Sequence, residues 1–114
     1  MPSTADPGAF AVGQIRSVEV GPEIVEYLER IDATLEPFGG RYVVHGSRAD
    51  VREGSWDGDL VVIGFPDRDH AERWYASDAY RAIRPLRSEH SDSTVLIVDA
   101  VGPGHRATDV LAAR

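Results

Sequence analysis

The sequence contains no cysteine and no lysine among its 114 residues. Without cysteine it cannot form a disulfide bond, a thiolate nucleophile or a Cys-ligated zinc or iron–sulfur site. Its twelve basic side chains are therefore all arginines; they are scattered along the chain, and the net charge is -7. A chain of this charge repels polyphosphates unless its arginines gather on one face. We therefore expect no nucleic-acid partner.

Long hydrophobic runs are also missing, as are the motifs of common cofactor folds. No apolar segment approaches the roughly 18 residues that span a bilayer, so no membrane partner is expected. Residues 1–8 lack the basic and apolar regions of a signal peptide, which indicates a cytoplasmic protein. No G-x-G-x-x-G, P-loop or G-x-S-x-G motif occurs, and the four histidines lack metal-ligand spacing. The sequence thus predicts neither a metal nor another cofactor.

The alternation and helical spacing of apolar residues predict secondary-structure elements in the order βαββαβ. Glycine and proline pairs separate these elements, and Asp67 and Ser77 are typical helix N-caps. The expected elements are a strand at 10–20, a helix at 22–35, an extended segment at 41–53, a strand at 60–65, a helix from 67 to 77 followed by a short helical segment that Pro85 interrupts, and a strand at 94–101.

This element order is that of a ferredoxin-like α+β sandwich, with a four-stranded antiparallel sheet and helices on one face. The length fits one domain, which we place at residues 10–101. A flexible N-terminus at 1–9 and a C-terminal extension at 102–114 would flank it. The extension is polar but ends in a few apolar side chains, so we expect it to lie against another surface.

The strand at 60–65 predicts self-association. Its residues, Leu-Val-Val-Ile-Gly-Phe, are so continuously apolar that both faces of the strand must be covered. Two helices can cover only one face of the sheet. A symmetric second copy readily covers the other, so we expect a homodimer.

Four ordered motifs carry a family resemblance. They are a Gly-Gly-Arg opening within 38–46, a Glu-Gly-x-Trp turn within 51–56, a Phe-Pro at 65–66 and a Trp-Tyr-x-Ser-x-x-Tyr at 74–80. With them, the chain from about Phe10 to about Val101 resembles family 1330 of the domains of unknown function. The resemblance implies a dimeric α/β barrel, related in architecture to small antibiotic-biosynthesis monooxygenases and muconolactone-isomerase-like proteins. In that assembly two sheets pack face to face and each subunit keeps a cleft; no established reaction is implied.

His45 and Arg41 are the candidate catalytic residues. His45 lies in a predicted strand and can act as an acid or base near neutral pH. Arg41 precedes it by two residues, so both side chains are expected on one strand face, where the guanidinium could hold a carboxylate or enolate. The alternatives are a hydrogen-bonded interface histidine and an arginine paired with Glu53 or Asp59.

The candidate ligand-binding residues are mostly aromatic. They are Trp56 in its Gly-flanked turn, Tyr75 and Tyr80 in the second helical region, with Glu53 and Arg87 as charged members. The aromatic residues could form a pocket wall, but aromatics at helical spacing more often belong to a core, and Trp74 is the first candidate for that role. Arg87 could bind an anion together with Arg84 and His90, although a solvated charged face is the simpler interpretation.

Three functional hypotheses therefore stay open. In the first, a small-molecule pocket performs proton-transfer or oxygen chemistry without a cofactor on an aromatic or enolisable metabolite. In the second, the protein is a ligand-binding or accessory dimer without turnover. A third use of the fold would be as an interaction module that docks through residues 102–111.

Overall fold

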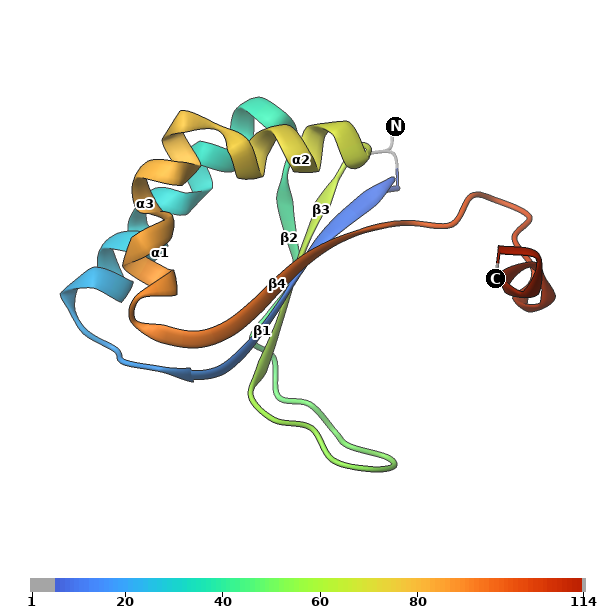
Figure 1. The fold of residues 1–114 in the computed structure, drawn as a ribbon, viewed down its shortest axis with the longest axis horizontal. Helices are drawn as coiled ribbons and strands as arrows, with labels where there is room; N and C mark the ends of the chain where they lie inside the picture. Colours follow the sequence, from blue (N-terminus) through green and yellow to red (C-terminus); the bar gives the residue numbers. More distant parts are fainter. Residues whose placement is uncertain (1–5, 114) are drawn as a thin grey trace.

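The computed structural model describes residues 6–113, which fold into one four-stranded antiparallel sheet covered by helices on one side (Figure 1). The sheet order is β2-β3-β1-β4. The elements in chain order are β1 (Ala9–Val18), α1 (Pro22–Leu35), η1 (Glu36–Phe38), β2 (Arg41–His45), β3 (Asp59–Phe65), α2 (Arg68–Ala76), α3 (Asp78–Ser88), β4 (Ser91–Asp99) and η2 (Ala107–Ala113).

The predicted ferredoxin-like α+β fold is confirmed. Strand β3 is an inner strand, as its apolar sequence indicated, and it pairs with β1 and β2. Both predicted N-caps are present: Asp67 accepts a hydrogen bond from the backbone N–H of His70, and Ser77 accepts one from that of Tyr80. These caps start α2 and α3, which lie with α1 over the same face of the sheet (Figure 1).

Some predicted boundaries are wrong. Ala9 is the first residue of β1 rather than part of a flexible terminus, and Gly8 before it donates to the Phe65 carbonyl and accepts from the Ala100 amide. Residues 1–5 of that expected flexible segment lie outside the described residues. Helix α3 continues through Pro85 to Ser88 instead of being interrupted.

The extended segment predicted at 41–53 is a strand only as far as His45. The chain then leaves the sheet in a long exposed loop, residues 46–58, which Figure 1 shows reaching beyond the sheet. Gly58 brings the loop back to β3: its φ is +91°, and an added Cβ would lie 2.1 Å from the Ile15 carbonyl oxygen. Glycine is required there because other residues favour neither that φ nor that contact.

A β-bulge in β2 shows that the predicted placement of Arg41 and His45 on one strand face is wrong. Tyr42 pairs with Ile63 but Val44 pairs with Val62, so one extra residue, Val43, is inserted between them. The insertion reverses the alternation of side chains beyond it. His45 therefore shares the helix-covered face of the sheet with Tyr42, whereas Arg41 lies opposite Gly64 on the outer face.

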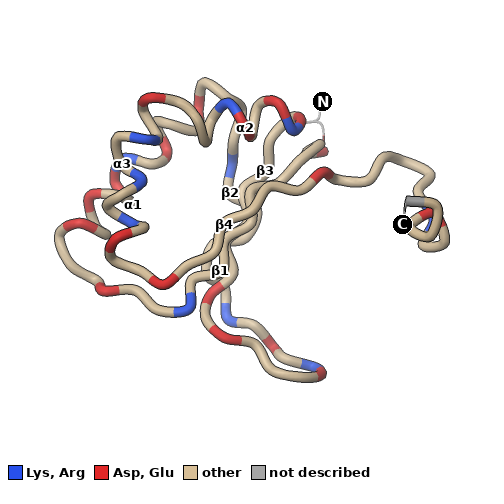
Figure 2. The backbone as a smooth tube through the Cα atoms, viewed as in Figure 1, with Lys and Arg blue, Asp and Glu red and all other residues tan. Residues whose placement is uncertain are grey.

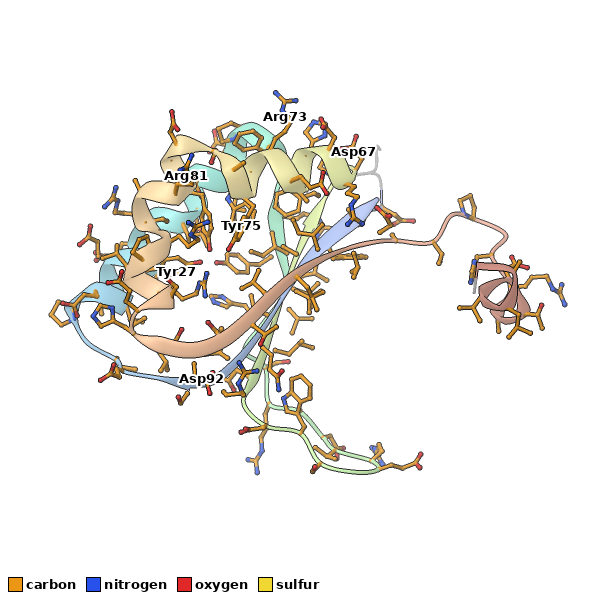
Figure 3. All side chains as sticks on the ribbon, in the orientation of Figure 1. Tyr27, Asp67, Arg73, Tyr75, Arg81 and Asp92 are labelled. Atoms are coloured by element: carbon orange, nitrogen blue, oxygen red, sulfur yellow. The ribbon has the colours of Figure 1, made fainter. Side chains whose placement is uncertain are left out.

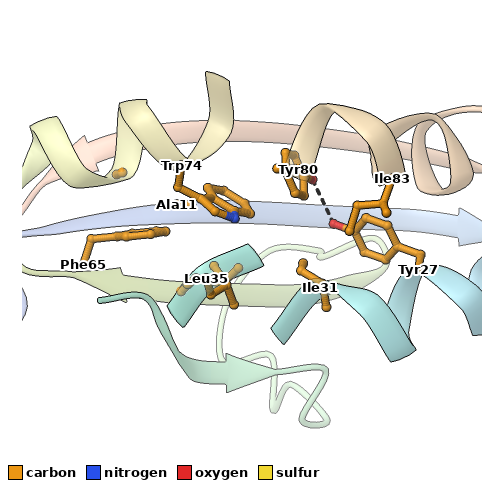
Figure 4. Packing of buried hydrophobic residues seen from close by; sticks show 10 residues of the cluster. Ala11, Tyr27, Ile31, Leu35, Phe65, Trp74, Tyr80 and Ile83 are labelled. Atoms are coloured by element: carbon orange, nitrogen blue, oxygen red, sulfur yellow. Dashed lines mark hydrogen bonds between the residues drawn. The ribbon is translucent and has the colours of Figure 1, made fainter. Parts of the chain in front are cut away.

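The core fills the space between the sheet and the helices at the α2 end. Trp74 is 2% exposed and packs on Phe65 with ring centroids 5.4 Å apart (Figure 4). Its indole N–H donates to the Thr34 hydroxyl. This confirms Trp74 as a core residue. Small residues, Ala11 and Ala71, make room for these rings between the two layers.

The outer face of the sheet carries apolar side chains that no helix covers. Leu96 and Val98 of β4 are 46% and 40% exposed. Their partners in β1, Val12 and Phe10, are only partly buried. Figure 2 shows the charged residues on helices, loops and the ends of strands, with the middle of the sheet free of them. This face is therefore an apolar surface on the described chain.

Candidate functional site

A cavity of about 330 Å³ opens between the sheet and helices α1 and α3, and the core residue Trp74 borders it. Its floor is the helix-covered face of β1 and β3, where Gly13 leaves space that a side chain would fill. Pockets of this size, mainly apolar with a few polar groups, are typical of small-molecule sites. Most of its lining side chains are apolar, including Ile15, Ile24, Leu28, Ile31, Val61, Ile63 and Val95.

Two tyrosines from different helices form the first polar group in the cavity wall. The hydroxyl groups of Tyr27 on α1 and Tyr80 on α3 are 2.8 Å apart (Figure 4). Burial raises the pKa of Tyr27 well above its ordinary value, and the neighbouring Tyr80 adds to the rise. Tyr27 is thus a neutral hydrogen-bonding group at physiological pH. Figure 3 shows it in the space between the helices and the sheet.

Arg87, in the last turn of α3, extends this polar group. Its Nη2 donates to the Tyr80 hydroxyl at 3.4 Å and its Nη1 donates to the Ser93 hydroxyl on β4 at 2.8 Å. The guanidinium carbon lies 5.8 Å from the centre of the Tyr27 ring. Three elements therefore hold the Arg87 side chain in the cavity wall.

His45 lines the same cavity at the end of β2. Its imidazole stacks on the Tyr42 ring, with centroids 4.2 Å apart and an angle of 18°. Burial first, then Asp32 and Tyr80, raise the pKa of Tyr42 to about 12. Asp59, also in the lining, lies on the same face two residues from Val61, the cross-strand partner of His45. An exposed acid–base group thus stands beside an apolar cavity.

The structure brings three of the predicted site residues together and leaves four apart. His45, Tyr80 and Arg87 line the cavity. Arg41 borders a separate shallow hollow near α1 and η1. The other three predicted residues lie elsewhere: Tyr75 packs edge-on against Trp74, Trp56 is 43% exposed and donates to the Gly58 carbonyl, and Glu53 is exposed in the 46–58 loop.

Neither alternative ion pair of Arg41 is present: among the described residues, no carboxylate of Glu53 or Asp59 lies within 4.0 Å of it. The group proposed around Arg87 also separates, because Arg84 lies over the Tyr75 ring and His90 faces Glu23. Arg87 alone of that group lines the cavity.

Tyr27, Tyr42 and Ser93 are site residues that sequence reasoning missed. Tyr27 recurs at helical spacing with Ile24 and Ile31, and that pattern predicts only burial. A buried tyrosine hydroxyl needs a hydrogen-bond partner, and this need is the one sequence signal that points to a polar contact at Tyr27. Regular alternation along β2 predicts Tyr42 on the face opposite His45, and the bulge that reverses this has no signature in the sequence.

Two further findings concern the described part of the chain. Between residues 6 and 113, no three His, Asp or Glu side chains gather closely enough to hold a metal ion. No helix in this range combines the length and apolar character needed to cross a membrane.

Several solved structures share this fold at low sequence identity. A protein of unknown function from Rhodopseudomonas palustris matches with a TM-score of 0.62 and 15% identity, over 87% of this chain and 86% of that chain. A dimeric ferredoxin-like protein of unknown function from Jannaschia sp. CCS1 matches with a TM-score of 0.62 and 10% identity, over 81% and 98%. SnoaB, a cofactor-independent oxygenase from Streptomyces nogalater, matches with a TM-score of 0.53 and 20% identity, over 90% and 100%.

Among curated protein sequences, none matches the chain. A family model does match: it covers residues 8–101, which include all four strands and the helices between them. The described motifs in β2, β3, α2 and α3 fall within this range, so the predicted resemblance is confirmed. The chain belongs to the family described as domain of unknown function DUF1330.

Proposed function

We propose that this protein is a homodimer that binds a small aromatic or enolisable molecule in the cavity and catalyses a proton transfer on it without a cofactor. The observation that supports this most is the cavity of about 330 Å³, whose mostly apolar lining also contains His45 and the Tyr27–Tyr80–Arg87 group. Apolar walls suit the body of such a ligand, and convergent polar groups suit its reacting oxygen.

The proposed step is the abstraction of a proton from carbon. A C–H bond next to a carbonyl group breaks, His45 takes the proton, and the electron pair moves to the carbonyl oxygen to give an enolate. Arg87 and a tyrosine hydroxyl donate hydrogen bonds to the oxygen that gains charge. The stacked Tyr42 ring keeps the His45 imidazole in place at the cavity. The similarly folded SnoaB, a cofactor-independent oxygenase, is consistent with such chemistry on this architecture.

Hydrogen–deuterium exchange tests this function without knowledge of the final product. A panel of aryl ketones and β-keto acids is incubated with the protein in D₂O, and loss of the α-proton signal is followed by NMR. We expect the wild-type protein to accelerate exchange for at least one compound and His45→Gln to lose the acceleration. His105→Gln, an exposed histidine of the C-terminal segment, is the matched control. Acceleration that survives in His45→Gln would refute the proposed base.

Binding without turnover is the second candidate function, and the β2 bulge favours it. The bulge removes Arg41 from the face that carries His45, and with it the polar pair first expected to do the chemistry. In this case a thermal-shift screen of metabolites would give stabilising ligands because binding to the native state raises its stability. No compound would then exchange faster with the protein than without it.

The proposed dimer would cover the outer face of the sheet. Leu96 and Val98 are about half exposed there, and the Jannaschia protein of the same fold is dimeric. Sedimentation at micromolar concentration should give twice the mass of one chain. Leu96→Glu should shift the equilibrium to the monomer, while Val51→Glu, an equally exposed position in the 46–58 loop, should not. A stable wild-type monomer would contradict the dimer.

A further inference from the structure

The charge of Arg87 has no opposite charge near it. Among residues 6–113, no Asp or Glu oxygen lies within 4.0 Å of its guanidinium. Its Nε is the one buried side-chain nitrogen or oxygen atom of the described residues that has no hydrogen-bond partner. Partly buried charges are ordinarily paired, because removal from water disfavours the charged form. Ser93, Tyr80 and the Tyr27 ring offset part of the desolvation cost of the guanidinium, but no carboxylate of the described chain contributes.

The donors around Arg87 also outnumber the acceptors. A guanidinium has five N–H groups and no acceptor. Hydrogen bonds to Ser93 and Tyr80 use two of them. The Tyr27 and Tyr80 hydroxyls have two hydrogens but share a single hydrogen bond, so one O–H stays available whichever of them donates. Ser91 uses its own hydrogen on the Arg87 carbonyl and offers no free donor. The polar wall can thus donate several more hydrogen bonds.

We propose that the cavity selects ligands with one negatively charged oxygen group, a carboxylate, phenolate or enolate, held by Arg87 together with a hydroxyl of the Tyr27–Tyr80 pair. This inference rests on the proposed function and names its ligand class. Hydrogen bonds from a guanidinium to an anionic oxygen are stronger than those between neutral groups. The negative charge of the ligand also offsets the positive charge of Arg87, and the ligand need not contact the buried Nε.

The surroundings of the cavity favour a monoanion over a polyanion. Arg87 is the one arginine in its lining, and the lining also contains the acid Asp59. The chain as a whole carries a net charge of -7. A phosphate ester or a dicarboxylate would bring more negative charge than one guanidinium can offset, whereas the apolar lining suits a flat hydrocarbon body.

Matched pairs of acid and amide test the inference. The probes are benzoate and benzamide, and 2-naphthoate and 2-naphthamide, measured by isothermal titration calorimetry at pH 7.5. Each pair has nearly the same shape and differs in charge. We expect the wild-type protein to bind the acid of at least one pair about tenfold more tightly than its amide, the scale of one charged hydrogen bond.

Arg87→Gln should remove this preference, and Arg87→Lys, which keeps the charge, should retain part of it. Arg84→Gln is the matched control because it makes the same charge change on the same helix, outside the cavity lining. Circular dichroism establishes that each variant is folded. If Arg87→Gln does not fold, the acid-over-amide preference of Arg87→Lys is compared with that of Arg84→Gln, and we expect the lysine variant to have the smaller preference.

The outcomes separate the inference from the proposed function. Equal binding of acid and amide by the wild-type protein would overturn the anion preference and leave a small-molecule cavity in place. Loss of the preference in Arg84→Gln as well would assign it to overall charge and also overturn the inference. If no probe pair binds and metabolite screening yields no ligand, the proposed function fails together with the inference.

Discussion

The two ends of the space between the sheet and the helices have the same layers but different contents. At the α2 end, Trp74 and Phe65 fill the space, and the indole N–H has its partner in Thr34. At the other end, Gly13 has no side chain to fill the space above the sheet. The buried Nε of Arg87 there has no hydrogen-bond partner among the described residues. The indole N–H at the packed end thus has a partner, whereas the Arg87 guanidinium at the open end keeps N–H groups without one among the described residues. Under the proposed function, the packed region accounts for most of the stability and the open region for binding, and Trp74 borders both.

Truncation of a side chain at the packed end should cause the largest change, a loss of stability. Trp74→Ala removes a fully buried ring and leaves Thr34 without its donor, so we expect a loss of about 3–5 kcal/mol in the free energy of unfolding. Urea denaturation at fixed protein concentration measures it. Trp56→Ala, which truncates a tryptophan that is 43% exposed, should cost less than about 1 kcal/mol. Similar losses for the two variants would contradict the assignment of the core.

Filling the open end should affect binding instead of stability. A Cβ at Gly13 would lie 3.7 Å from its nearest neighbour, an ordinary contact, so a larger side chain extends into the cavity without a clash at its base. We expect Gly13→Val to weaken 2-naphthoate binding by at least about tenfold, equivalent to about 1.4 kcal/mol. Its melting temperature should stay near that of the wild type. Gly13→Ala, which adds one methyl group, should bind nearly normally; unaltered binding by Gly13→Val would place the ligand elsewhere.

The tyrosine pair should show a smaller, coupled effect on stability. Tyr27→Phe breaks the hydrogen bond between the two hydroxyls and should cost about 1 kcal/mol. Tyr80→Phe also removes the acceptor of Arg87 and should cost somewhat more. The double variant leaves neither hydroxyl unpaired, so its cost should be less than the sum. Additive costs in a urea double-mutant cycle would show that the two hydroxyls do not interact.

The smallest expected effect concerns alkaline pH. The pKa of Tyr42 is raised to about 12 in the folded protein, above the usual value of about 10. The native state therefore holds this proton more tightly than the unfolded state between these values. The resulting stabilisation is complete below about pH 10 and is lost as the pH rises to about 12. In Tyr42→Phe, stability should fall less steeply over this range, as measured by urea midpoints; an unchanged slope would contradict the shift.

The sequence was sufficient for the fold because each element carries its own signal. Asp67 and Ser77 cap their helices as their positions predicted, and the apolar run of β3 identified an inner strand. These signals are local, and the family resemblance agrees with them. Burial of Trp74 followed from helical spacing in the same way.

The site was less predictable because it depends on register and on contacts between distant elements. A single inserted residue, Val43, places His45 on the face opposite Arg41. No residue type in β2 predicts such a bulge. The Tyr27–Tyr80 contact joins positions 53 residues apart on two helices. The sequence offers Arg87 as a candidate for anion binding, but the absence of a described carboxylate within 4.0 Å of it is visible only in three dimensions.

Amide chemical-shift mapping with 2-naphthoate tests most directly whether the open end is the binding site. Titration of the ¹⁵N-labelled protein should produce saturable shifts at Gly13, Gly46 and Arg87, all in the cavity lining. Residues of the exposed segment 101–112 should stay unchanged. Saturable shifts confined to the outer face of the sheet or to that segment would contradict a ligand site between the sheet and the helices.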